Sequence, residues 1–176
     1  MSDAATARTL RRVYLLTAAG TIAWLAAVLA APWLASRGAE GPARALYLLF
    51  SPLCHQIPER CFTLGGRPLA VCARCLGIYS GFAGGLALFP LVRGFARPVL
   101  PRFRVFLLLA APMALDALAG IAGVWSSPGP ARFATGFLWG TLLPFYFVAG
   151  AADLLAGRRS RPAGATTDLK RGPGKT

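Results

Sequence analysis

The sequence contains 176 residues, of which 56% are hydrophobic and 14% are charged, whereas ordinary globular chains have roughly 45–50% and about 25%. So few polar residues cannot cover the apolar surface of a water-soluble domain, which excludes that class and indicates lipid as the solvent. The net charge of +13 would suit a nucleic-acid binder, but the positions of the charges along the chain argue against that function.

Four apolar runs are long enough to cross a bilayer, which requires about 20 residues in a helix. The first run carries no charge and is longer than the apolar core of a cleaved signal peptide, so we predict that it is retained. The predicted spans are residues 13–35, 69–92, 103–125 and 133–155. Together they predict an all-α polytopic membrane protein in which residues 1–156 form a single four-helix domain.

Basic residues are unequally distributed between the two sides of this topology. Of the 19 lysines and arginines, 13 lie before the first span, around the loop between the second and third, or after the fourth. The positive-inside rule therefore predicts a multi-pass protein of the plasma membrane with both termini in the cytoplasm. We expect the charges to contact anionic lipid rather than nucleic acid. The tail at 157–176 lacks apolar periodicity and is expected to be disordered and cytoplasmic.

The long loop at residues 36–68 would face outward in this topology. It contains the apolar run A-L-Y-L-L-F at 45–50, which is too short to cross the membrane. This run predicts a short helix in the first outer loop, as a re-entrant or interfacial segment.

Glycines recur four residues apart in two of the spans. The second span contains Gly77, Gly81 and Gly85, and the fourth contains Gly136 and Gly140. Small residues at this spacing let helix backbones approach closely in lipid. We therefore predict that these two helices pack tightly against each other. The same glycine faces would also allow the chain to form an oligomer. The sequence indicates no particular protein partner.

Asp116 is the one acidic residue well inside a span. An ionisable group at that depth is costly and usually faces the bundle interior. Its depth corresponds to that of Tyr79 or Ser80 on the second span, about one turn below Cys75, which places it within reach of Arg74. One interpretation is a structural ion pair with Arg74 or Arg132. The other is a proton carrier beside an outer site, which would make Asp116 and Arg74 candidate catalytic residues.

All four cysteines and the single histidine lie between residues 54 and 75. Thiolates and imidazole are the ligands of tetrahedral zinc. The spacing Cys72-x-x-Cys75 allows two sulfurs to hold one ion, and Cys54 with His55 would complete a Cys3His set. Zinc is the first choice for softness and geometry, while iron or copper would accept the same ligands.

A second interpretation is thiol–disulfide chemistry. The run C-A-R-C-L-G-I-Y at 72–79 is similar to the CxxC segment of quinone-linked, disulfide-generating membrane oxidoreductases. That likeness implies that Cys72 and Cys75 exchange electrons with a quinone, while Cys54 and Cys61 pass the oxidation onward. Those enzymes keep their second cysteine pair between the third and fourth spans, where this chain has none. A third interpretation is a pair of purely structural disulfides.

The strings C-H-Q-I-P-E-R at 54–60 and P-L-A-V-C-A-R-C-L-G-I-Y-S-G at 68–81 resemble a family of small prokaryotic membrane proteins, domain-of-unknown-function family 2085. The likeness extends from about residue 50 to residue 144. It implies no activity, substrate or cofactor, so whether the protein is an enzyme stays open. The family usually has serine at the position of Cys61, which argues against a pair with Cys54. The resemblance therefore favours a ligand set of Cys54, His55, Cys72 and Cys75.

The same resemblance implies residues that support the site. The positions that match the family pattern are Gln56, Arg60, Arg74, Asp116, Arg132 and Thr135. We expect Gln56 either to orient His55 or to hold the backbone of a turn, and Thr135 to cap or pack the fourth span. Arg60 has an alternative partner in the adjacent Glu59. The leading prediction is thus an integral membrane protein with a Cys3His-type transition-metal site at its outer face.

Overall fold

Four long helices dominate the structure, a computed structural model that describes residues 3–93 and 103–157. Each of them is long and apolar enough to cross a membrane, which confirms the predicted all-α polytopic fold. These helices are α1 (Asp3–Ser36), α3 (Ala73–Arg93), α4 (Phe103–Ile121) and α5 (Gly129–Gly157). Nearly all of the predicted tail, from residue 158 onward, lies outside the described residues.

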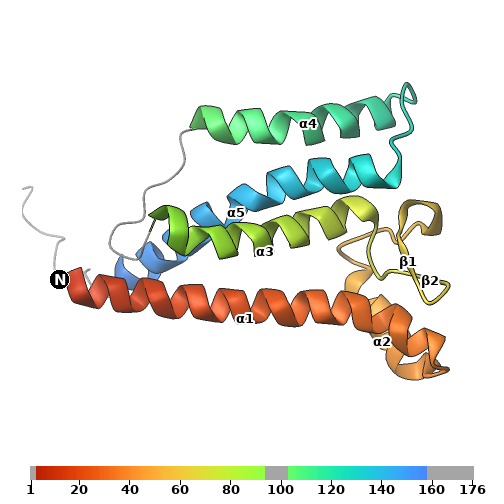
Figure 1. The fold of residues 1–176 in the computed structure, drawn as a ribbon, viewed down its shortest axis with the longest axis horizontal. Helices are drawn as coiled ribbons and strands as arrows, with labels where there is room; N and C mark the ends of the chain where they lie inside the picture. Colours follow the sequence, from red (N-terminus) through yellow and green to blue (C-terminus); the bar gives the residue numbers. More distant parts are fainter. Residues whose placement is uncertain (1–2, 94–102, 158–176) are drawn as a thin grey trace, which may run out of the picture.

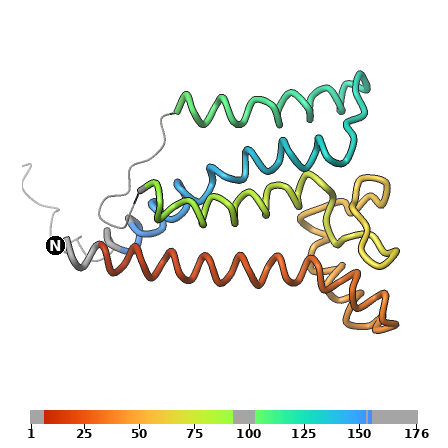
Figure 2. The backbone as a smooth tube through the Cα atoms, viewed as in Figure 1, coloured from red at the N-terminus to blue at the C-terminus, as the bar shows by residue number. Residues whose placement is uncertain are grey.

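Consecutive long helices run in opposite directions, so the start of α1 and the end of α5 lie at the same end of the bundle (Figure 1). We call the opposite end, where residues 37–72 and 122–128 connect the helices, the loop end. The predicted short helix of the first loop is present there as α2 (Glu40–Phe50). It is followed by the 3-10 turn η1 (Pro58–Arg60) and a small antiparallel hairpin of β1 (Thr63–Leu64) and β2 (Arg67–Pro68). Figure 2 shows this compact loop folded beside the end of α1.

Helix α3 begins at Ala73, four residues later than the start predicted for the second span. The intervening residues are occupied by loop contacts instead. The amide of Leu69 donates to the carbonyl of Phe62, and the carbonyl of Ala70 accepts from the side chain of Gln56. Ala70 and Val71 are fully buried. Tertiary packing therefore fixes residues 69–72 as a turn, although their composition continues the apolar run.

Helix α4 ends at Ile121, four residues before the predicted end of the third span. Gly123 has a φ of 69° and so takes the left-handed conformation that commonly follows a helix C-terminus. The amide of Val124 donates to the carbonyl of Ala119, which completes the C-terminal turn. The glycine therefore stops the helix before the apolar composition ends.

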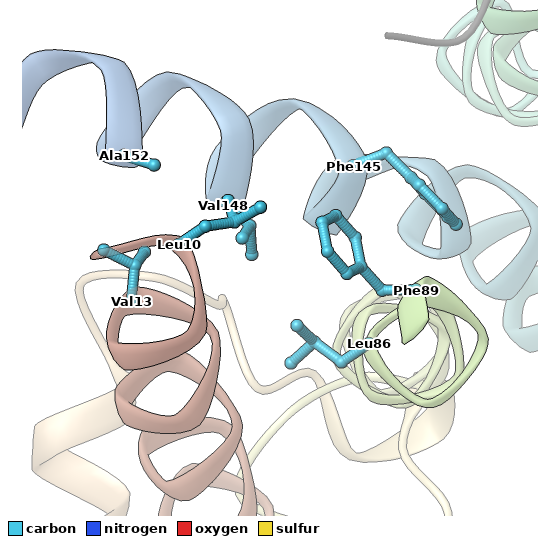
Figure 3. Close-up of a cluster of buried hydrophobic side chains, with 7 residues drawn as sticks. All are labelled: Leu10, Val13, Leu86, Phe89, Phe145, Val148 and Ala152. Atoms are coloured by element: carbon cyan, nitrogen blue, oxygen red, sulfur yellow. The ribbon is translucent and has the colours of Figure 1, made fainter. Parts of the chain in front are cut away.

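Helix α1 starts at Asp3, ten residues before the predicted start of the first span. Leu10 and Val13 belong to an apolar cluster with residues of α3 and α5, and both are buried. Figure 3 shows this cluster, in which Phe89 of α3 and Phe145 of α5 lie across from the α1 side chains. The burial explains why the helix extends past the uncharged run.

Helices α3 and α5 approach each other at their glycines, as the spacing predicts. A Cβ atom built on Gly81 would lie 2.2 Å from the carbonyl oxygen of Phe137. In the reciprocal direction, a Cβ on Gly140 would lie 2.2 Å from the carbonyl oxygen of Ile78. Real side chains do not tolerate such contacts, so these positions require glycine. The close contact confirms the predicted tight packing of the second and fourth spans.

A second apolar cluster fills the loop end beneath the cysteines. Val28 and Ala31 of α1 meet Phe50 of α2, and the ring of Trp24 packs edge-on against Phe50 with centroids 4.9 Å apart. Cys54 is a buried member of the same cluster, and Cys72 and Cys75 pack against it. The three cysteines are therefore held in place by contact with this buried apolar cluster.

Candidate metal site

Three cysteines from two separate segments converge at the loop end. The Sγ atoms of Cys54, Cys72 and Cys75 all lie within 4.8 Å of one another. Cys54 follows α2, Cys72 immediately precedes α3, and Cys75 lies in the first turn of α3. Within residues 3–93 and 103–157, no other three or more histidine, cysteine and acidic side chains gather in this way. We refer to Cys54, Cys72 and Cys75 as the thiol triad.

The triad is positioned by the backbone of the first loop. The amide of Cys54 donates to the carbonyl of Phe50, which continues the last turn of α2. Gln56 has a φ of 52°, and this left-handed residue turns the chain back toward α3. Its side-chain amide donates to the carbonyls of Tyr47 at 2.7 Å and Ala70 at 2.8 Å. Gln56 thus holds the backbone of a turn, one of the two roles expected for it.

Several groups around the triad stabilise negative charge on sulfur. The backbone amide of Cys72 donates to Cys54 Sγ at 3.1 Å. The N-terminus of α3 lies at Cys72, where the helix dipole stabilises negative charge. Hydrogen bonds from the Cys54 and Cys75 side chains lower the pKa of Cys72. A cluster with these properties can bind a cation that takes sulfur ligands.

A cavity of about 320 Å³ opens beside the triad, and we call it the thiol cavity. All three cysteines line it, together with His55 and with Met113 of α4. His55 is exposed, and its ring nitrogens are not part of the group of mutually close ligand atoms. The structure therefore brings together three of the four predicted ligands and leaves the fourth on the wall of the same cavity.

Cys61 lies outside the triad. Its thiol donates to the carbonyl of Ile57 at 3.2 Å, and none of the four cysteines forms a disulfide in the structure. Burial, reinforced by the nearby Cys54 and Cys72, raises the pKa of Cys61 to about 11. The structure thus separates this thiol chemically from the other three.

The ion pair between Arg74 and Asp116 is present, as one of the two interpretations of Asp116 predicted. A terminal nitrogen of Arg74 on α3 donates to Asp116 on α4. The other carboxylate oxygen accepts from the hydroxyl of Ser127, which is buried. Arg132 Nε on α5 then donates to the Ser127 carbonyl at 2.8 Å. This network connects three long helices and the 122–128 loop at one place.

Ser127 is a member of this network that sequence reasoning missed. It stands before Pro128 and Gly129, at the start of α5. A serine at that position is a familiar sign of a helix cap. Its bond to a carboxylate on another helix depends on how α4 is placed and so leaves no signal in the local sequence.

The remaining predicted supporting residues differ in what they contact. Arg60 is exposed, lines the thiol cavity and forms no ion pair with Glu59 within the described residues. Thr135 donates its hydroxyl to the carbonyls of Ala131 and Arg132 within its own helix. Arg60 therefore belongs to the site's surroundings, whereas Thr135 stabilises α5 from within.

Comparisons with known proteins show which family the chain belongs to. The chain is 36% identical over 103 residues to "Uncharacterized protein MJ1492" of Methanocaldococcus jannaschii, a match covering 58% of this chain and 66% of that protein. It is 38% identical over 89 residues to an uncharacterized protein of Methanothermobacter thermautotrophicus, covering 49% of this chain and 77% of the relative. No solved structure matches. The model of the family described as "Predicted membrane protein (DUF2085)" matches residues 54–146, a region that contains the whole thiol triad and the arginine–carboxylate network, and the chain belongs to that family.

Proposed function

We propose that this integral membrane protein binds a transition-metal ion through Cys54, Cys72 and Cys75. The observation that carries the proposal is the convergence of three sulfurs within 4.8 Å of one another from positions up to 21 residues apart. Zinc–sulfur bonds of about 2.3 Å place the sulfurs of a tetrahedral site roughly 3.8 Å apart. Small side-chain rotations would bring the triad to that spacing.

Zinc is the first candidate for the ion. Three thiolates select soft or borderline metals over magnesium or calcium, and zinc accepts the tetrahedral geometry without redox chemistry. Iron or copper would accept the same sulfurs. A divalent ion with three thiolates has a net charge of −1, which Arg74 and Arg132 on the wall of the cavity would balance.

His55 is the candidate for the fourth ligand, because it lines the same cavity as the three sulfurs. A four-ligand site of this kind is closed and structural. It would lock the loop after α2 onto the first turn of α3. The side chains of Asp116 and Gln56 are already engaged in hydrogen bonds, which favours this structural role over activation of a bound water.

The test is metal analysis of the full chain purified in mild detergent. We expect about one metal ion per chain, and we expect added Cd²⁺ to produce thiolate-to-metal charge-transfer absorption. Cys54→Ser, Cys72→Ser and Cys75→Ser should each lose the ion and the absorption. Cys61→Ser is the matched control and should keep both, because that thiol lies outside the triad. His55→Ala should weaken binding and leave the sulfur signal in place.

The contradicting result is protein without metal, with no Cd²⁺ absorption and with Cys72 joined to Cys75 in a disulfide. That result would favour the thiol–disulfide alternative. In that reaction the two thiols lose two electrons and two protons to a quinone, which becomes a quinol while the disulfide forms. A mixed disulfide trapped by Cys72→Ser would identify the partner.

The membrane and the orientation are part of the same proposal. Thirteen of the 19 basic residues lie in the sequence before the first predicted span, around the loop between the second and third, or after the fourth, which supports a plasma-membrane protein with both termini cytoplasmic. The thiol triad would then face outward. Labelling a single cysteine introduced at Arg44, in a chain without Cys61, with a membrane-impermeant reagent on intact cells tests this. Labelling only after cell lysis would contradict it.

A further inference from the structure

We propose that the loop end also carries a binding site for a phosphoryl anion, formed by the guanidinium groups of Arg60, Arg74 and Arg132. These residues come from η1, α3 and α5, so they are far apart in the sequence. All three line the thiol cavity, and all three also line a neighbouring cavity of about 410 Å³. The arginines therefore form a shared wall between two cavities.

Positive charge on this wall exceeds the negative charge that faces it. No acidic residue lines either cavity within the described part of the chain. On this wall, the described residues show one ion pair, between Arg74 and Asp116. One carboxylate is thus paired with a wall of three guanidinium groups, which leaves a net charge of about +2, or about +1 when a metal–thiolate centre of charge −1 occupies the triad.

Donor groups on the wall also lack acceptors. Arg74 Nε is buried and has no hydrogen-bond partner within the described residues. Arg132 uses its Nε for the Ser127 carbonyl, and no ion pair holds its terminal nitrogens. A buried donor without a partner is costly, and an anion in the cavity would supply the missing acceptor.

The helix ends add to this positive field. Both α3, which starts at Ala73, and α5, which starts at Gly129, have their N-termini at the loop end. Each contributes a partial positive charge there. These dipoles reinforce the arginines and do not define the site by themselves.

The chemistry of the wall fits a phosphoryl group. Such a group carries about −1.5 to −2 charges at neutral pH and three acceptor oxygens, which matches the excess charge and several guanidinium forks. The larger cavity also exposes the apolar side chains of Ile121 and Trp125 at its edge. The phosphoryl group could therefore come from a lipid headgroup or from the aqueous phase, and the proposal does not depend on metal at the thiol triad.

The experiment compares two probes on the full chain. Inorganic phosphate is titrated calorimetrically into protein in detergent, and binding of phosphatidic acid is measured in phosphatidylcholine nanodiscs by native mass spectrometry. We expect saturable binding of at least one probe. Phosphate alone would identify an aqueous ligand, and phosphatidic acid with weak phosphate binding would identify a lipid headgroup. Both measurements are repeated after chelator treatment, and we expect saturable binding to persist.

Arg60→Gln is the informative variant, because Arg60 is exposed and removing it breaks no ion pair in the described residues. We expect its affinity to fall about tenfold or more, the cost of one charge-assisted contact. Arg44→Gln removes the same charge from exposed α2 and should stay within about twofold. Arg132→Lys keeps the charge, loses the planar fork and should bind more weakly than the unmodified chain. Equal affinities for Arg60→Gln and Arg44→Gln, or no saturable binding of either probe, would overturn the proposal.

Discussion

Helices α3 and α5 are held together along their backbones, whereas α4 is attached to its neighbours through side chains, at Asp116 and at the ring of Phe106. Glycines on both α3 and α5 bring carbonyl oxygens so close that a Cβ atom would collide with them. Helix α4 has no buried residue among Phe103–Ile121, and its Asp116 side chain bonds to Arg74 and Ser127. Within one bundle, the α3–α5 contact thus depends on backbone approach at glycines, whereas the contacts of α4 depend on side chains.

This difference indicates which contacts make the site rigid. The α3–α5 pair carries Arg74, Cys75 and Arg132, and Cys72 immediately precedes α3, so backbone contact between the two helices fixes the positions of these residues. The position of α4 depends on a carboxylate that lies beside the same site. Changes at the glycines should therefore disrupt the α3–α5 pair, and changes at Asp116 should act on α4 while leaving that pair intact.

The largest effect is expected from Gly81→Val. Its Cβ would lie 2.2 Å from the carbonyl oxygen of Phe137, so α3 and α5 would have to separate. Overpacking of this kind should lower the free energy of unfolding by about 3 kcal/mol, measured by reversible unfolding in mixed micelles. Gly150→Val is the control, because no atom lies within 4 Å of its Cβ position. Equal stability of the two variants would show that the close approach is not what holds the helices.

Asp116→Asn should have the next largest effect. The change leaves Arg74, whose side chain is 22% exposed, without its charged partner. We expect a loss of about 2 kcal/mol in unfolding free energy, below the cost of breaking a fully buried pair. Glu40→Gln breaks the pair with Arg67, whose side chain is 52% exposed, and should cost less than about 0.5 kcal/mol. Similar losses in the two variants would contradict a special role for the α4 contact.

Gln56→Ala extends the comparison to the first loop, which is held by a side chain clamped on backbone carbonyls. Loss of the bonds to Tyr47 and Ala70 should cost about 1 kcal/mol and speed proteolysis of residues 37–72. Ser51→Ala is the control, since its hydroxyl bonds to Leu48 at an exposed position of the same loop. A protease pattern identical to that of the unmodified chain would argue against the clamp.

The smallest structural effect is expected at Cys61, which lies outside the triad. Cys61→Ser should leave unfolding free energy and metal content unchanged. Its folded pKa is raised from 9.0 to about 11, so at pH 8 its thiolate fraction is roughly 100-fold below that of an ordinary thiol. Alkylation followed by mass spectrometry should be slow and should accelerate about tenfold per pH unit between pH 7 and 10. A plateau near pH 9 would contradict the raised pKa, and denatured protein supplies the reference rate.

The sequence alone predicted the parts of the protein that follow from local periodicity and composition. These parts are the four spans, the short helix in the first loop and the glycine faces. Each is visible in the sequence as an apolar run or a regular spacing, because residues on one face of a helix recur every three or four positions. The spacing of Cys72 and Cys75 indicated a shared site for the same reason: both lie at the start of one helix. The family resemblance was likewise carried by short motifs and is confirmed by the match over residues 54–146.

Other features, such as helix boundaries and contacts within the site, follow from the tertiary structure because they depend on contacts between residues far apart in the sequence. Packing of Leu10 in the first apolar cluster extends α1 ahead of the uncharged run. The hydrogen bonds of Gln56 delay the start of α3, and the left-handed Gly123 ends α4, although the apolar composition continues at both places. The fold also placed His55 on the cavity wall, apart from the three predicted sulfurs, and added Ser127 to the predicted pair of Asp116 and Arg74. Such choices depend on how separate segments fold together, and no local repeat in the chain records that arrangement.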